Sequence, residues 1–338
     1  ILPKTTKTFL ERFPAETWQA GDCVVTNDPW LATGHLPDFT AVSPIFHKGK
    51  LVGFAGSISH SPDVGGALWS ADCRELFEEG IRIPPSRLFR AGKRNEDLAE
   101  VLLANVRLPR QVMGDLEAQV IANEVCARGV DEFLGDTGLP DLQGLGAALH
   151  QRADAAMRRA IAALPDGTWH STLEADGFDE AITRIACAVT IKGDTMHIDF
   201  AGSSKQVDRG INCVLNYTHA YSVYPVKCAL DPFTPRNEGS YGAITVSAPE
   251  GSILNPRFPA ACSARQLTGH LLAGAIYKAL APIMPDKIIA ECGGAPTMRA
   301  ARRSPGTRRE PARACRPRKP SRPRRRRRRA RRHRSSAR

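Results

Sequence analysis

Apolar and polar residues alternate along two separate parts of the chain, which predicts two groups of β-strands. The first group lies within residues 22–60, where a short apolar run at 22–28 precedes two strand-like segments joined around residues 48–50. The second lies within residues 168–200, with a turn predicted at 192–194. Each group is therefore expected to present a face to a core. The alternating apolar positions of the second group are Ile185, Cys187, Val189, Ile191, Met196, Ile198 and Phe200.

Residues 94–164, between these groups, have apolar positions spaced three or four apart, which predicts helices ending at Pro165–Gly167. Farther along, residues 216–230 and 264–281 are expected to be helices, with a strand within 241–249. Strands, a helical insert and then mixed elements favour an α+β fold with mixed sheets, forming one large catalytic unit. The apolar positions of the insert are Val112, Met113, Leu116, Val120, Val125, Leu142, Leu145, Leu149, Ala153, Met157, Ala160 and Leu164.

Charge divides the chain into a body and a tail. Hydrophobic residues make up 42% of the 338 residues, enough for a sizeable core. The net charge is +12, yet residues 301–338 hold 19 of the 47 Lys and Arg residues and one of the 35 acidic residues. Residues 1–300, the predicted folded domain, therefore carry a net charge of −6.

Two explanations of the Arg-rich tail stay open. With Arg, Pro, Ala and Ser as its main residues it cannot form a packed core, and as a disordered arm it would bind nucleic acid through phosphate contacts. A GC-rich gene translated in a shifted frame would give the same composition, and the abrupt change after residues 291–300 favours this second explanation. In either case nucleic acid is not expected to be a partner of the body.

Several features predict a cytoplasmic protein. No run of eighteen apolar residues is present, so no membrane span is expected. The N-terminus has neither a Met nor an apolar signal-peptide core, and we expect the chain to begin inside a longer protein. The nine cysteines include no CxxC pair and are predicted to be reduced, most of them as small core residues.

One cluster of polar residues suggests chemistry. Within 37 residues, strand ends and Gly- and Pro-rich turns carry Asn27, Asp28, His35, Asp38, His60 and Asp63. Imidazoles with carboxylates suit a divalent ion such as Mn, Fe or Zn, and two His with one carboxylate leave positions open for water or substrate. The alternative is that each is an ordinary turn residue. Outside the cluster, we expect His47 to be solvated at a hairpin tip and His197 and Asp199 to lie on the polar face of a strand.

The same residues carry a family resemblance. The segments TNDPWLATGHLPDFT, HSPDVGG, FEEGIRIPP, GINCVLNYTHA and GSILNPRFPAACSARQLTGHLL, with others in order over residues 2–300, resemble the hydantoinase B/oxoprolinase family. This family includes the B-type component of ATP-dependent N-methylhydantoinase, the C-terminal half of 5-oxoprolinase and a component of acetone carboxylase. The resemblance implies a subunit of an ATP-dependent cyclic-amide hydrolase, with a hydantoinase A-type partner that carries the ATP site.

The resemblance also implies roles for residues. In the carboxylase branch two His and one Asp bind manganese, and the motif match places these ligands at His35, Asp38 and His60. Asp63 is our candidate for the general base. Candidates for substrate binding are Asn27, Asp28, Asn212 and Arg265, and Asn216 and His270 lie in similar polar stretches.

Two departures from the family pattern leave the substrate open. Ser61 stands where relatives often carry a second His, and the segment ALWSADCREL replaces the one that commonly follows the glycine pair. A ketone carboxylase subunit is therefore one alternative function. A truncated, non-catalytic scaffold is another.

Overall fold

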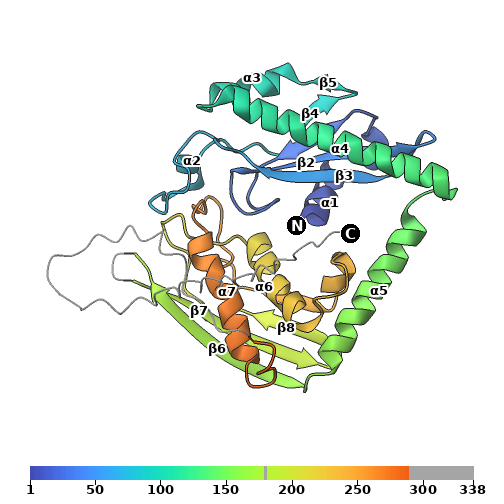
Figure 1. Cartoon of the computed structure of the whole chain (residues 1–338). Coiled ribbons are helices and arrows are strands. Elements are labelled where there is room, and N and C mark those ends of the chain that lie inside the picture. Colours follow the sequence, from blue (N-terminus) through green and yellow to red (C-terminus); the bar gives the residue numbers. More distant parts are fainter. Residues whose placement is uncertain (179–180, 289–338) are drawn as a thin grey trace, which may run out of the picture. The chain divides into compact units, whose positions relative to one another are not determined.

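The computed structural model describes residues 1–178 and 181–288, and it confirms the predicted α+β class (Figure 1). The chain divides into one compact unit, Ile1–Gly293, and a second part, Gly294–Arg338. The predicted boundary after residue 300 and the Arg-rich tail lie outside the described residues. The first unit contains two sheets, each with its own core.

The first sheet has five antiparallel strands in the order β3-β2-β1-β4-β5. The predicted hairpin is present, and its turn at Lys48 and Gly49 has positive φ at both residues, as tight hairpin turns require. The sequence did not predict the last two strands. The bounds are β1 Cys23–Thr26, β2 Asp38–His47, β3 Lys50–His60, β4 Ser86–Arg90 and β5 Lys93–Arg94.

Helices cover both faces of the first sheet, which explains the unbroken apolar run in β1. Val24 packs with Phe9 of α1 (Leu2–Arg12), whereas Val25 packs with Leu116 of α4 (Pro109–Thr137). Successive strand residues point to opposite faces, so both must be apolar when both faces are covered. Short elements complete this region: η1 (Ala15–Thr17), α2 (Leu76–Glu79) and α3 (Glu96–Ala104).

Helix α5 (Gln143–Ala162) leads from α4 to the second sheet, whose order is β6-β7-β8-β9 (Figure 1). The last pair is parallel and the others are antiparallel. The predicted alternation is confirmed, because Ile185, Cys187, Val189 and Ile191 are all buried under the helices. The remaining bounds are β6 Gly167–Asp176, β7 Ile182–Lys192, β8 Thr195–Asp199, β9 Ile244–Ser247, α6 Leu215–Leu230, η2 Glu238–Tyr241 and α7 Gln266–Leu280.

The helical insert buries less of its apolar spacing than predicted. Val125 of α4 and Leu145 and Leu149 of α5 are exposed, while Met157 and Ile161 farther along α5 are fully buried. Helix α5 packs into the second core through its C-terminal half. Periodicity therefore predicted where the helices lie, but not which part of each helix packs against another element.

Several contacts join the two cores, among them those of Trp30 and Glu79. The Trp30 side chain packs against both of them. The buried carboxylate of Glu79 in α2 accepts hydrogen bonds from the backbone N–H groups of Cys262 and Ser263, at 2.6 and 2.7 Å. Residues far apart in sequence are therefore fixed next to each other between the sheets.

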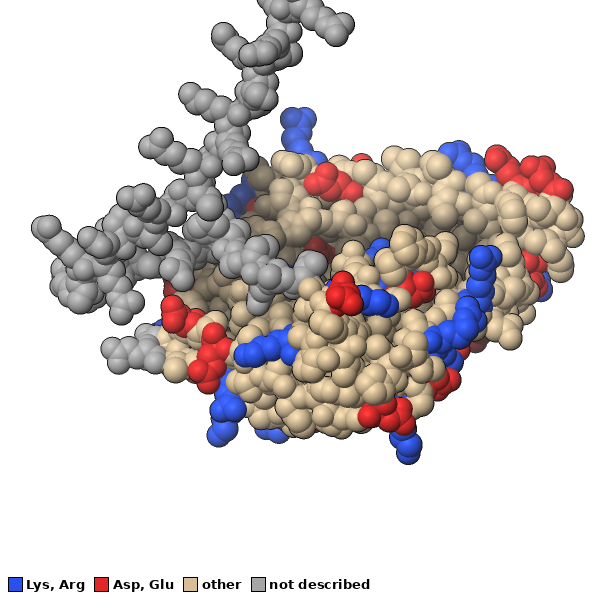
Figure 2. Space-filling view, turned by 60° about the horizontal axis from the view of Figure 1, so that its bottom comes forward, with Lys and Arg blue, Asp and Glu red and all other residues tan. Residues whose placement is uncertain are grey.

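The visible surface carries charges of both signs, and most of the described cysteines are buried, as predicted for small core residues. On the face in Figure 2 that grey atoms leave visible, Lys and Arg lie interspersed with Asp and Glu. None of the helices in residues 1–178 and 181–288 has the length and apolarity to cross a membrane. The seven cysteines of these residues are free, and five of them are buried: Cys23, Cys73, Cys187, Cys213 and Cys262.

Candidate metal site

The β2–β3 hairpin brings two of the predicted ligands together. Asp38, the first residue of β2, pairs with His60, the last residue of β3. His35 lies in the preceding turn, and its Nε2 is 2.9 Å from Asp38 Oδ2. His60 Nε2 is 4.0 Å from Asp38 Oδ1, and one ligand atom from each residue lies within 4.8 Å of the others. We call His35, Asp38 and His60 the triad.

The triad has the chemistry of a metal-binding set. Burial lowers the pKa of His35, so its imidazole is neutral near pH 7. Burial acts to raise the pKa of Asp38, but the contacts with His35, Thr33 and Arg265 outweigh it and lower that pKa. A neutral imidazole and an anionic carboxylate are the forms that bind a metal ion.

Hydrogen-bond geometry supports the same conclusion. Neither ring nitrogen of the buried His35 has a well-formed hydrogen bond among the described residues, although Nε2 lies close to Asp38. Such a buried group is costly unless another partner takes its lone pair. The His60 side chain is 41% exposed, so the triad is open to solvent on one side. The residues present therefore fit a divalent cation with open coordination positions.

Arg265 lies behind Asp38. Its Nη2 donates to Asp38 Oδ2 at 3.2 Å and to the carbonyl oxygen of Thr33 at 3.3 Å. Its guanidinium also stacks over the ring of Tyr217, 4.6 Å from the centroid. The contacts of this buried guanidinium favour a role in holding Asp38 in place, and substrate binding by Arg265 stays a prediction. Gly34 is needed here, because a Cβ at its φ of +101° would lie 2.9 Å from Tyr217 Cβ.

Asp63 is 2% exposed and is held by neighbours. Its carboxylate accepts hydrogen bonds from the backbone N–H groups of Gly65 and Arg107, and Arg107 Nη1 lies 2.8 Å from Oδ1. These contacts outweigh burial and lower the pKa of Asp63. A carboxylate with a lowered pKa and occupied lone pairs is a weak base, so the contacts favour a role in fixing the loop after His60 over our prediction of a general base.

The predicted substrate-binding amides are used within the protein. Both N–H groups of Asn27 are donated, to the carbonyl oxygens of Leu36 and Ile81. The Asn212 amide donates to three backbone carbonyl groups, and both Asn side chains are fully buried. These amides brace loops, and the contacts do not favour direct substrate binding. Asp28 pairs with Arg82 at 3.3 Å and is 7% exposed.

The remaining polar residues lie elsewhere. The prediction for His47 is wrong: it is 6% exposed and its Nδ1 is 2.7 Å from Asp131 Oδ1, because α4 packs over the hairpin end. His197 contacts Thr245 at 2.8 Å, as expected for a strand's polar face. Asn216 donates to the Trp30 carbonyl, and His270 is exposed.

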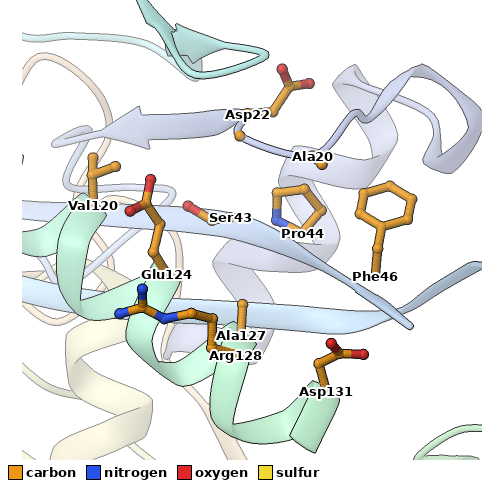
Figure 3. Close-up of a pocket in the computed structure, with 11 residues that line it drawn as sticks. Ala20, Asp22, Ser43, Pro44, Phe46, Val120, Glu124, Ala127, Arg128 and Asp131 are labelled. Carbon is orange, nitrogen blue, oxygen red and sulfur yellow. The ribbon is translucent and has the colours of Figure 1, made fainter. Parts of the chain in front are cut away.

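A hollow of about 360 Å³ lies between α4 and β2 (Figure 3). Its polar groups are mainly acidic, and Figure 3 shows Glu124, Arg128 and Asp131 of α4 on one side of it. It shares no residue with the triad, so we do not assign the chemistry to it. Its lining is Ala20, Gly21, Asp22, Ser43, Pro44, Phe46, Val120, Glu124, Ala127, Arg128 and Asp131.

The fold is an α+β unit with a His-Asp-His set at the open end of a hairpin. The Hydantoinase B/oxoprolinase family model matches residues 1–312, and the chain belongs to that family. The predicted resemblance is thereby confirmed.

Individual proteins similar to this chain include components of a hydantoinase and of a caprolactamase. The B-type component of a putative D-/L-hydantoinase from a Pseudomonas species (strain NS671) is 31% identical, over 82% of this chain and 50% of its own length. The beta component of the caprolactamase of Pseudomonas jessenii is 32% identical, over 84% and 50%. The chain thus spans about half the length of these relatives.

Solved structures share the fold. The crystal structure of ATP-dependent caprolactamase from Pseudomonas jessenii superimposes with a TM-score of 0.79 at 30% identity, over 85% of this chain and 50% of that chain. Nucleotide-free acetone carboxylase has a TM-score of 0.72 at 19% identity, over 85% and 42%, and shows the fold alone.

Proposed function

We propose that this chain is the B-type component of an ATP-dependent enzyme that hydrolyses cyclic amides in the cytoplasm. A partner of the hydantoinase A type binds ATP and transfers its terminal phosphoryl group to the carbonyl oxygen of the ring amide. Water then adds to the carbonyl carbon, the ring C–N bond breaks and the nitrogen takes a proton, which leaves an acyl phosphate. A second water hydrolyses this acyl phosphate to the carboxylate and inorganic phosphate. The related hydantoinase and caprolactamase components support this reaction class.

The observation that carries the proposal is the convergence of His35, Asp38 and His60 on one point that is open to solvent. A divalent ion such as Mn²⁺, Fe²⁺ or Zn²⁺, when bound there, polarises an oxygen or lowers the pKa of a water. The protein supplies the geometry: strand pairing sets Asp38 against His60, and Arg265 holds Asp38 from behind.

The first test is the metal content of the full chain, measured by mass spectrometry for the wild type, His35→Ala and His60→Ala. Both variants should lose the metal, because two remaining ligands bind a divalent ion much more weakly. His270→Ala is the matched control, because His270 is exposed on α7 and should leave the content unchanged. A folded wild type that takes up no Mn, Fe or Zn would contradict the metal site.

The reaction is tested with the A-type partner present. ATP-dependent ring opening of hydantoin, 5-oxoproline or caprolactam should occur and should be lost in His35→Ala. Bicarbonate-dependent carboxylation of a ketone would place the chain with the carboxylases instead. Absence of both activities in a metal-loaded complex would favour a scaffold.

A further inference from the structure

Trp69 is a large aromatic residue placed directly over the triad. Its indole stacks on the His60 ring, with centroids 4.7 Å apart and an interplanar angle of 14°. It also meets the His35 ring edge to face, at 5.3 Å. The Trp69 side chain nevertheless remains 49% exposed. One indole therefore covers both imidazoles and keeps much of its apolar surface in contact with solvent.

The backbone at Trp69 is strained. Its φ is +59°, in the left-handed region that bulky residues rarely occupy. Such a conformation persists only where the surrounding contacts enforce it, and these residues concentrate at functional sites. The loop is held on both sides of Trp69. Ala67 N–H donates to the Glu78 carbonyl at 2.8 Å, and the Ser70 carbonyl accepts from Ser263 Oγ at 2.9 Å.

The loop around Trp69 also packs tightly against the backbone at Gly210, which leaves no space for the loop to move in that direction. Gly210 N–H donates to the Ala71 carbonyl at 2.9 Å, and a Cβ on Gly210 would lie 2.3 Å from the Ser70 oxygen. These contacts draw on residues from both cores, so the position of the indole is fixed by tertiary structure. An exposed aromatic ring held in this way is preorganised for contact with a ligand.

We propose that Trp69 forms one wall of the substrate site and determines its specificity. The indole favours flat, small cyclic amides over puckered, larger lactams. This inference rests on the proposed function for the identity of the ring. A planar five-membered ring such as hydantoin can lie against a flat indole, whereas the seven-membered ring of caprolactam is puckered and contacts it less closely. Trp69 would then position the substrate carbonyl toward the triad.

The position of the wall is tested first with a metal alone. Co²⁺ absorbs and quenches nearby indole emission, and N and O ligands accept it. Adding Co²⁺ to the full wild-type chain should quench the fluorescence of Trp69. The Trp69→Phe variant lacks this fluorescence and should therefore show much less quenching. The matched control is Trp169→Phe, since Trp169 packs on the other core and should leave the quenching intact. Equal quenching in the wild type and in Trp69→Phe would overturn the placement.

Selectivity is tested by calorimetric titration of the Co²⁺-loaded chain with hydantoin and with caprolactam. The wild type should bind hydantoin about fivefold more tightly, as expected for one aromatic stacking contact. Trp69→Ala should reduce the ratio to about one, and Trp69→Phe, which keeps a flat ring, should retain most of it. An unchanged ratio in Trp69→Ala, or no binding of either ring, would overturn the proposal. Selective binding without ATP-dependent hydrolysis would instead contradict the proposed function and leave the wall in place.

Discussion

Arg265 shows how the surroundings of one residue decide its role. From sequence, an Arg in a polar stretch was a candidate for binding a substrate carboxylate. In the structure the carboxylate it meets is Asp38 of the same chain, and its flat guanidinium rests on Tyr217. The amides of Asn27 and Asn212, also candidates for substrate binding, donate to backbone carbonyl groups of the same chain. A residue type indicates which bonds are available, but packing decides where they are made.

If Arg265 positions Asp38, Arg265→Gln should weaken metal binding by about tenfold, the usual size of the effect when a partner of a metal ligand is removed. Arg265→Lys keeps the charge but loses the planar fork, and should recover only part of the affinity. The measurement is competitive titration of Mn²⁺ or Zn²⁺ against a chelator. Arg257→Gln is the control, because Arg257 pairs with Glu250 on the exposed surface. Full affinity in Arg265→Gln would exclude a positioning role.

At the scale of elements, the hairpin of β2 and β3 was the most predictable part of the site. Alternation located both strands and the Lys48–Gly49 turn between them. That turn alone would pair Asp38 with Ser59, and the irregularity between Ile45 and Phe46 shifts the register by one residue, so that Asp38 lies opposite His60. The short strands β4 and β5 and the helix α2 were not predicted, because elements of so few residues give too weak a pattern of apolar and polar positions. The link from α2 to the residues before α7 depends on Glu79, which the sequence did not single out.

Glu79 makes the stability of this link depend on pH. Burial raises its pKa from 4.5 to about 7, although the N–H groups of Ser263 and Cys262 act to lower it. Folding thus favours the protonated acid. The contribution of Glu79 to the free energy of unfolding is greatest below pH 4.5 and falls as the pH rises to 7, by about 3 kcal/mol.

Glu79→Gln, which stays neutral, should therefore gain stability relative to the wild type between pH 5 and pH 8, as measured by urea denaturation. Glu75→Gln is the control, because Glu75 is exposed one turn away and should follow the wild type at each pH. A difference between Glu79→Gln and the wild type that stays constant with pH would show that Glu79 is ionised throughout.

At the scale of the whole unit, residues of two cores build one site. The triad comes from the first sheet, while Arg265 and Tyr217 come from the helices of the second core. Gly269 of α7 permits this arrangement, since a Cβ there would lie 2.3 Å from Tyr217 Cε1 and 2.6 Å from its hydroxyl oxygen.

Gly269→Ala should displace Tyr217 and, through Arg265, weaken metal binding by about tenfold, with a loss of stability of about 1–3 kcal/mol from overpacking. Gly129→Ala in α4 is the matched control, because no atom lies within 4 Å of its added Cβ. The control should keep its metal affinity and gain up to about 1 kcal/mol in the free energy of unfolding. Chelator competition and urea denaturation measure both effects. Equal metal affinity in the two variants would mean that the second core does not act on the site.

The sequence by itself determined the α+β class and the hairpin, because strand alternation and turn chemistry are local properties, and its resemblance to the family supplied the three candidate ligands. Only the tertiary structure decided that Arg265 faces Asp38, that Asp63 is held by Arg107, and that Trp69 covers His35 and His60. These contacts join residues from separate elements, and their geometry depends on how the two cores pack. Periodicity carries no information about that packing.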